Sequence, residues 1–199
     1  MIEPLLRAPN RRAGLLDLQG AGLSEVDFLL KFLIRQNGVT ELVLAGNPVR
    51  DAQMTPFLEG LLHFKPAVKA LDLSGTRLSA ESMRTVERLF LQESLLRVLV
   101  LDENRIGTDA FIAVMHATRK STRVHELSFV RCGITIDANE DAAKDLLESM
   151  SQNCSIHRLA LEGNVVHDAV LTDLAVELDK NQGIVEKIFP LFELSLIHI

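Results

Sequence analysis

The side chains that could carry chemistry form no known catalytic pattern. Six histidines and two cysteines are scattered among 199 residues. We find no H-E-x-x-H zinc motif, no phosphate-binding glycine loop, no G-x-S-x-G nucleophile turn and no C-x-x-C pair. A metal site at His125 and His157 would need further ligands that the sequence does not supply. We therefore predict no catalytic residue, no cofactor and no metal, and we expect that the chain is not an enzyme.

Four basic or titratable residues nevertheless recur at regular spacing. Lys69, Arg97, His125 and His157 lie 28, 28 and 32 residues apart, and a repeating element would stack them in one column. Two interpretations stay open. The column neutralises the C-terminal ends of nearby helices, which favour cations, or it contacts an acidic ligand. A contact through the two histidines would weaken as pH rises through about 6.5.

A sixfold sequence repeat supplies the element that positions these residues. The segments LLDLQGAGL, ELVLAGNPV, ALDLSGTRL, VLVLDENRI, ELSFVRCGI and RLALEGNVV align on the pattern L-x-L-x-x-N-x-L. Their first leucines are Leu16, Leu42, Leu71, Leu99, Leu127 and Leu159. The alternating leucines predict short strands, and apolar pairs four residues apart, such as Phe57 and Leu61, predict helices between the strands. Asp51 and Ser79 are candidate N-caps of two of these helices.

This pattern resembles the leucine-rich repeats, in their ribonuclease-inhibitor-like subclass. The resemblance covers Ala13 to about Lys187. It implies an α/β solenoid shaped as a horseshoe arc, with about six repeats of 28–29 residues, parallel strands on the concave face and helices on the convex face.

The Asn position of the repeat pattern has a structural explanation. The chain turns inward after each strand, and the buried backbone groups of that turn need hydrogen-bond partners. We therefore expect Asn104 and its equivalents to be structural. By the same argument Cys132 fills a small buried position and is not a nucleophile, and we see no reason to pair it with Cys154.

Residues between the core leucines should point out of the concave face, because side chains alternate along a strand. Small apolar side chains there lie among acids, which predicts a protein partner with a basic, partly apolar surface. The predicted contact residues are Asp17, Glu41, Val43, Asp72, Val98, Val100, Asp102, Glu126, Ser128 and Val130. The alternative is that β-branched residues simply suit strands.

Composition narrows the class of partner and the compartment. The net charge of −6 argues against nucleic acid, and no apolar run approaches the roughly 18 residues of a membrane span. Two cysteines do not suggest a disulfide framework, so we expect the cytoplasm or the nucleus. We predict a non-enzymatic, intracellular protein–protein interaction module that binds through its concave face and adjoining loops.

Three other roles fit the same repeats. Ran GTPase-activating proteins resemble this repeat class and present loop residues to a GTPase. Arg77 and Arg105 follow the asparagine position, where such a loop would lie, but we transfer no catalytic residue from that family. Actin-end-capping proteins have similar repeats, and so do recognition segments of larger receptors or sensors.

The two ends of the chain depart from the repeat. We expect residues 1–12 to be an N-terminal cap or the break point of a longer array, and residues 13–187 to be the leucine-rich repeat domain. A seventh strand should start near Ile188, but Pro190 would interrupt it. We therefore expect residues 188–199 to be an irregular tail, either truncated or partly non-native.

Overall fold

The alternating leucines build six short parallel strands in one sheet. The computed structural model describes residues 13–36, 38–92 and 94–188. The strands are β1 (Leu15–Asp17), β2 (Glu41–Val43), β3 (Ala70–Asp72), β4 (Val98–Val100), β5 (Glu126–Ser128) and β7 (Arg158–Ala160), in that order across the sheet. The register pairs the first leucine of each repeat with that of the next, as Leu42 with Leu71. The predicted strand columns are therefore confirmed.

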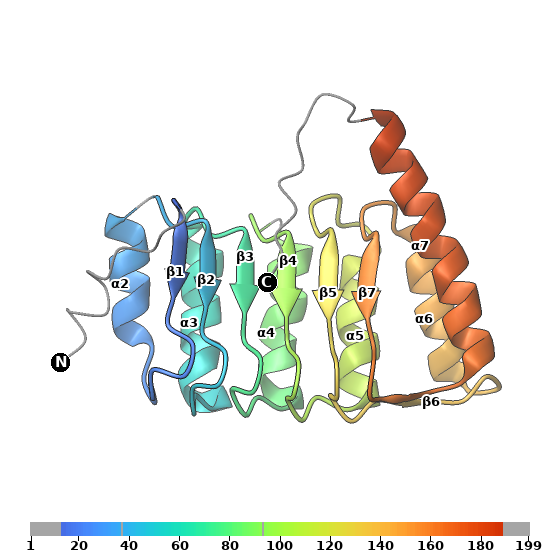
Figure 1. Ribbon diagram of the computed structural model, residues 1–199, viewed down its shortest axis with the longest axis horizontal. Helices are drawn as coiled ribbons and strands as arrows, with labels where there is room; N and C mark the ends of the chain where they lie inside the picture. Colours follow the sequence, from blue (N-terminus) through green and yellow to red (C-terminus); the bar gives the residue numbers. More distant parts are fainter. Residues whose placement is uncertain (1–12, 37, 93, 189–199) are drawn as a thin grey trace.

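Among the described residues, six helices lie in a single layer behind this sheet (Figure 1). They are α2 (Asp27–Arg35), α3 (Asp51–Phe64), α4 (Ala80–Leu91), α5 (Thr108–Thr118), α6 (Asp141–Gln152) and α7 (Asp168–Ile188). Helices α2 to α6 each lie along the chain between one strand of the sheet and the next, so the six strands of this sheet point the same way and the helices run the opposite way. The arrangement is the α/β solenoid that the repeat predicts.

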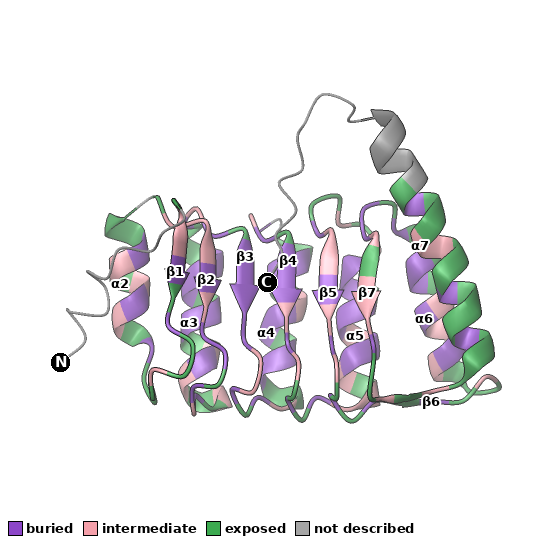
Figure 2. Cartoon of the chain, in the orientation of Figure 1, coloured by how far each residue is buried: buried purple, intermediate pink, exposed green. Residues whose placement is uncertain are grey.

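The core is a continuous apolar layer between the sheet and the helices. The strand leucines Leu44, Leu73 and Leu101 are each 0% exposed, and so are Val86 and Val114 on the helices. Figure 2 shows buried residues along the central strands β3 and β4 and both buried and exposed residues on the helices behind them. Every repeat thus buries its apolar face against its neighbours rather than within itself.

Asparagine side chains link the turns of neighbouring repeats. Asn104 Nδ2 donates to the carbonyl oxygens of Leu101, in its own repeat, and Leu73, in the preceding one, both at 2.8 Å. Its Oδ1 accepts a hydrogen bond from Leu78 N at 2.8 Å. Asn47 and Asn164, each two repeats away from Asn104, make the same set of bonds. The predicted structural role of this column is confirmed.

One predicted helix cap serves a neighbouring helix instead of its own. Ser79 caps α4 as expected, because its hydroxyl accepts from Glu81 N. Asp51 makes no cap for α3; its carboxylate accepts hydrogen bonds from the backbone and hydroxyl groups of Ser79 and Ser82 in the next repeat. Burial raises the pKa of Asp51, but these hydrogen bonds outweigh burial and the net shift is downward.

The C-terminal end differs from the expectation in one respect. Helix α7 continues through Ile188, so the seventh strand predicted to begin at that residue is wrong, and the irregular tail does not start there. A second, two-stranded sheet, which the repeat pattern does not predict, joins β6 (Thr135–Ile136) to β8 (Val165–Val166) on the way to the last two helices. Residues 1–12 and 189–199, where we expect a cap and a tail, lie outside the described residues.

The asparagine links predict a large loss of stability on truncation. Asn104→Ala would leave the buried N–H group of Leu78 unpaired and would remove the amide hydrogen bonds to the carbonyl groups of Leu73 and Leu101, which keep only Thr76 Oγ1 and Cys132 Sγ. At roughly 1–3 kcal/mol for the unpaired group and about 1 kcal/mol for each lost hydrogen bond, the free energy of unfolding should fall by about 3 kcal/mol. Urea unfolding followed by circular dichroism measures this change.

The matched control is Asn139→Ala, because Asn139 is exposed and its side-chain amide makes no hydrogen bond with the described chain. We expect less than about 0.5 kcal/mol of change there. Equal effects at the two positions would contradict the structural role of Asn104.

Candidate functional site

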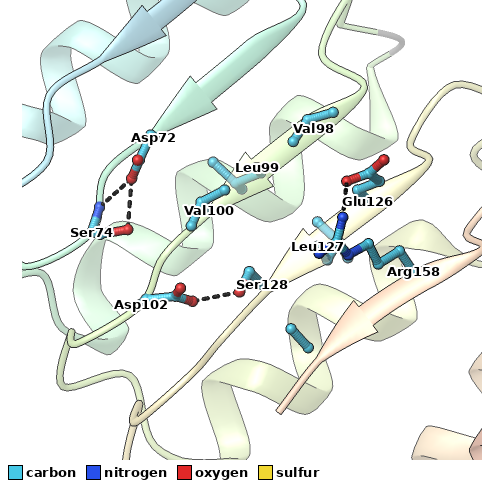
Figure 3. Close-up of a pocket in the computed structure, with 11 residues that line it drawn as sticks. Asp72, Ser74, Val98, Leu99, Val100, Asp102, Glu126, Leu127, Ser128 and Arg158 are labelled. Carbon is cyan, nitrogen blue, oxygen red and sulfur yellow. Dashed lines mark hydrogen bonds and ion pairs between the residues drawn. The ribbon is translucent and has the colours of Figure 1, made fainter. Parts of the chain in front are cut away.

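The concave face has a hollow of about 260 Å³ over β3, β4, β5 and β7 (Figure 3). Two rows of paired residues form its floor. One row runs Asp72, Val100, Ser128 and Ala160 across the four strands, and the other contains Val98, Glu126 and Arg158. The hollow therefore contains six of the ten predicted contact residues: Asp72, Val98, Val100, Asp102, Glu126 and Ser128. The other four, Asp17, Glu41, Val43 and Val130, do not line it.

Two aspartates at the ends of β3 and β4 are held by serine side chains. Asp72 Oδ1 accepts from Ser74 N at 2.9 Å and from Ser74 Oγ at 2.6 Å. Asp102 Oδ1 accepts from Ser128 Oγ at 2.6 Å and from Val130 N at 2.8 Å, so it joins the fourth repeat to the fifth. The Oδ2 atoms of both aspartates make no hydrogen bond with the described chain. Each carboxylate is thus fixed in place with one oxygen left for a partner.

Two of the predicted contact residues are less accessible than expected. Val98 is 8% exposed and Asp72 is 6% exposed, whereas Val43, Val100 and Val130 are half-buried. Neighbouring strands in a sheet lie about 4.8 Å apart, so the residues paired with Val98 on each side, Ala70 and Glu126, crowd its side chain. The expectation that Val98 and Asp72 stand open to water is wrong.

The second row of the floor contains an ion pair. Glu126 Oε2 lies 3.6 Å from Arg158 Nη1, and Glu126 Oε1 lies 4.0 Å from His157 Nε2. Arg158 offsets the charge of Glu126, while no salt bridge joins Asp72 or Asp102 to a cation among the described residues. The electrostatics of the hollow therefore differ from one side to the other: one carboxylate has an ion-pair partner and the other two have none.

The four residues of the basic column do stack in the structure. The backbone N–H of Arg97 bonds to the carbonyl of Lys69, that of His125 to Arg97, and that of His157 to His125. Lys69 and Arg97 are exposed, and the two histidines are half-buried with ring centroids 5.6 Å apart. Both histidine Nδ1 atoms lie near the carbonyl oxygen of Ser155, at 3.3 and 3.4 Å.

The surroundings of His125 favour its neutral form. Burial lowers the pKa of His125, the hydrogen bond to the Ser155 carbonyl raises it, the nearby charges of His157 and Arg97 lower it, and Glu126 raises it; the net shift is downward. An acidic contact through this ring would therefore need a pH below about 6.5, lower than the sequence alone suggests.

The remaining reactive side chains lie apart from the hollow. Arg77 and Arg105 are exposed on the loops that follow β3 and β4, and neither lines the hollow. Both cysteines are free. Cys132 is fully buried, its Sγ lies 3.2 Å from the carbonyl oxygen of Leu101, and burial raises its thiol pKa to about 11, which suits the predicted packing role rather than a nucleophile.

A search of the described residues finds no group of three or more His, Cys, Asp or Glu side chains that could hold a metal ion. Over the same residues, no helix combines the length and apolar character that crossing a membrane requires.

The predicted contact residues omit five that line the hollow: the polar Ser74 and Arg158 and the apolar Leu99, Leu127 and Ala160. Ser74 and Arg158 occupy outward-facing positions of the repeat, so the column alignment could have found them. The alignment could not predict the bonding partner of either side chain. Ser74 donates to Asp72 in its own repeat, whereas Arg158 pairs with Glu126 on the neighbouring strand β5.

Comparison with known proteins places the chain among repeat proteins of known fold. No family model matches the chain. It is 28% identical to the pig (Sus scrofa) ribonuclease inhibitor over 172 residues, which cover 85% of this chain and 37% of that protein. It is 25% identical to the mouse (Mus musculus) NACHT, LRR and PYD domains-containing protein 5 over 71% of this chain and 12% of that protein. The chain thus spans little more than a third, at most, of the length of these relatives.

Solved structures give the same fold. The actin-binding site 2 domain of leiomodin-1 matches with a TM-score of 0.69 and 16% identity, over 83% of this chain and 94% of the domain. The tropomodulin C-terminal domain of Caenorhabditis elegans matches with a TM-score of 0.69 and 15% identity, over 79% of this chain and 96% of that domain. With the geometry above, these matches support the resemblance: the chain has the leucine-rich-repeat fold and is similar in sequence to a ribonuclease inhibitor.

The lowered pKa of His125 predicts how stability depends on pH. A histidine that is harder to protonate in the folded state than in the unfolded state stabilises the fold above about pH 6.5, and this contribution is lost as pH falls below that value. Between pH 7.5 and pH 5 the wild-type chain should therefore lose more stability than the His125→Asn variant. Thermal unfolding across this pH range measures the difference.

The exposed His63 provides the control, because it lies at the end of α3 away from the column. His63→Asn should follow the wild-type pH profile. A His125→Asn profile that also matches the wild type would show that His125 does not contribute to the pH dependence.

Proposed function

We propose that the chain is a non-enzymatic, intracellular protein-interaction module and that its concave hollow binds a cationic side chain of a partner protein. The observation that carries the proposal is the pair of fixed carboxylates, Asp72 and Asp102, on one hollow with the half-buried Val100. A lysine or arginine has an aliphatic stem that suits Val100 and a charged head that suits the free carboxylate oxygens. The partner surface would be basic and partly apolar.

The geometry favours binding over catalysis. The carboxylates are held by hydrogen bonds from Ser74, Ser128 and Val130, and the described residues contain no group of three or more His, Cys, Asp or Glu side chains that could hold a metal ion there. Fixed charges of this kind contribute specificity and association rate to an interface. The free state of both cysteines supports an intracellular setting.

A second candidate is binding to actin. The domain of leiomodin-1 that shares this fold is named for an actin-binding site, and the match covers most of both chains. At 16% identity the shared fold does not carry the contact residues with it. Cosedimentation of the purified chain with actin filaments tests this candidate directly.

Two further roles remain predictions. A match to a protein whose name includes NACHT and PYD domains is compatible with a recognition segment of a larger receptor. A role in GTPase regulation would depend on the exposed Arg77 and Arg105 and would be lost on their replacement by alanine.

We predict that Val100→Lys weakens binding of the partner at least about tenfold, because the new ammonium group occupies the hollow and repels the incoming cation. Affinity capture from cells with quantitative mass spectrometry identifies proteins that bind the wild-type bait and not the variant. Isothermal titration with the purified partner then measures the change in Kd.

The matched control is Val176→Lys, which introduces the same charge at a side chain that is 51% exposed on α7. This bait should retain every partner. If the Val100→Lys bait retains them as well, the concave hollow is not the binding site.

A further inference from the structure

A different surface runs along the edge where the convex helices end and the strands begin. Three loops, residues 65–69, 94–97 and 119–125, lead from α3, α4 and α5 into β3, β4 and β5 along the upper edge of the sheet in Figure 1. We call these loops and the last turns of α3, α4 and α5 the helix-exit edge. It is separate from the concave hollow and none of the proposed function depends on it.

The helix-exit edge concentrates uncompensated positive charge. Its exposed cations are Lys65, Lys69, Arg97, Lys120 and Arg123. No salt bridge joins any of these five to the described residues, whereas Arg119 beside them pairs with Glu148 at 3.4 Å. The described residues of the three loops contain no Asp or Glu. Two acids directly adjoin these loops in the sequence: Glu93, which lies outside the described residues, and Glu126, which is paired with Arg158 at 3.6 Å.

Helix electrostatics explain only part of this charge. Lys65 and Lys120 follow the C-terminal ends of α3 and α5, where carbonyl groups stabilise cations. Lys69 and Arg97 instead occupy adjacent positions just before the strands, joined through their backbones, and like charges placed side by side destabilise a sheet. An anionic partner would offset that repulsion.

Apolar side chains are exposed along the same edge. Phe64 is 54% exposed at the end of α3, and Leu91 is 65% exposed at the end of α4. Between the ends of α4 and α5 lies a hollow of about 200 Å³. Its apolar lining includes Leu89, Leu91, Leu96 and Val124, and Lys120 and Arg123 also line it. This volume is below the roughly 300–1,000 Å³ of small-molecule sites and suits an apolar side chain of a protein.

We propose that the helix-exit edge binds an acidic segment of a partner protein, with one apolar side chain in the hollow between α4 and α5 and flanking carboxylates against Lys120, Arg123 and Arg97. A recessed hollow with cations beside it matches a peptide that inserts a side chain. A membrane surface would instead take apolar side chains that protrude together. The edge thus selects a partner of opposite charge to the one that suits the concave hollow.

Selection from a displayed library of random twelve-residue peptides tests the proposal. The wild-type chain is the target, and peptides that also bind the variant Leu91→Asp, Lys120→Glu, Arg123→Glu are removed first. We expect the enriched peptides to carry Leu, Ile or Phe flanked by Asp or Glu. Fluorescence polarisation of the most enriched peptide should give a Kd at least about tenfold higher for the triple variant, and a Kd that rises with salt.

The matched control variant is Val176→Asp, Lys144→Glu, Lys180→Glu, which makes the same kinds of change at exposed residues of α6 and α7. It should bind the peptide as the wild type does. Circular dichroism verifies that the triple variant is folded; if it is not, Arg123→Glu alone replaces it.

Three results would overturn the proposal: no enrichment, enrichment of peptides without acids, or equal loss of binding in the control variant. Vesicles containing phosphatidylserine are tested in parallel. Binding to vesicles that the triple variant loses, without any enriched peptide, would also overturn it and assign the edge to an anionic membrane surface.

Discussion

The hydrogen-bonding requirement of the turn after each strand governs the rest of this structure. The chain must leave the sheet and bury the turn, and buried N–H and carbonyl groups without partners would cost more than the core could recover. Asn47, Asn104 and Asn164 meet this requirement with one amide each, bonded to two carbonyl groups and at least one N–H group. Because every amide reaches the preceding repeat, the same bonds that satisfy one turn also fix the spacing of the strands. The concave surface is a consequence of that spacing.

Several other polar side chains also form hydrogen bonds between adjacent repeats. Asp51 accepts hydrogen bonds at the start of the next helix, Asp102 fixes the end of the next strand, and Thr108 bonds to both backbone groups of Thr135. In a solenoid each repeat contacts only its neighbours, so stability depends on such interface contacts. Asp102, which lines the concave hollow, therefore has two roles: one oxygen joins adjacent repeats and the other stays available to a partner.

The parts of the fold that depend on the spacing of residues could be predicted from the sequence. The parts that depend on which neighbours a side chain packs against, or which hydrogen-bond partner it takes, could not. The leucine columns, the helix faces and the buried role of Asn104 follow from periods of 2, 3.6 and about 28 residues. The low exposure of Val98 and Asp72 depends on which residues flank them across the sheet and on a bond to Ser74. Likewise, the sequence pattern cannot show that the Asp51 carboxylate accepts hydrogen bonds at the start of the next helix rather than capping its own helix. Within the site, the strip was predictable, but the hollow and its pairing of Glu126 with Arg158 were not.

The separation of charge between the two surfaces follows from the direction of the chain. Because all strands are parallel, all helices end at the same edge of the solenoid, and each contributes carbonyl groups that favour cations there. Lys65 and Lys120 follow two of these helix ends, so their position there needs no further explanation. The acids of the concave face are instead placed one by one through hydrogen bonds. In the proposed function, individually fixed carboxylates recognise a basic partner surface, so a single substitution should weaken that contact. In the further inference, the combined field of several cations recognises an acidic segment, so the loss of binding should depend on how many of these charges are removed.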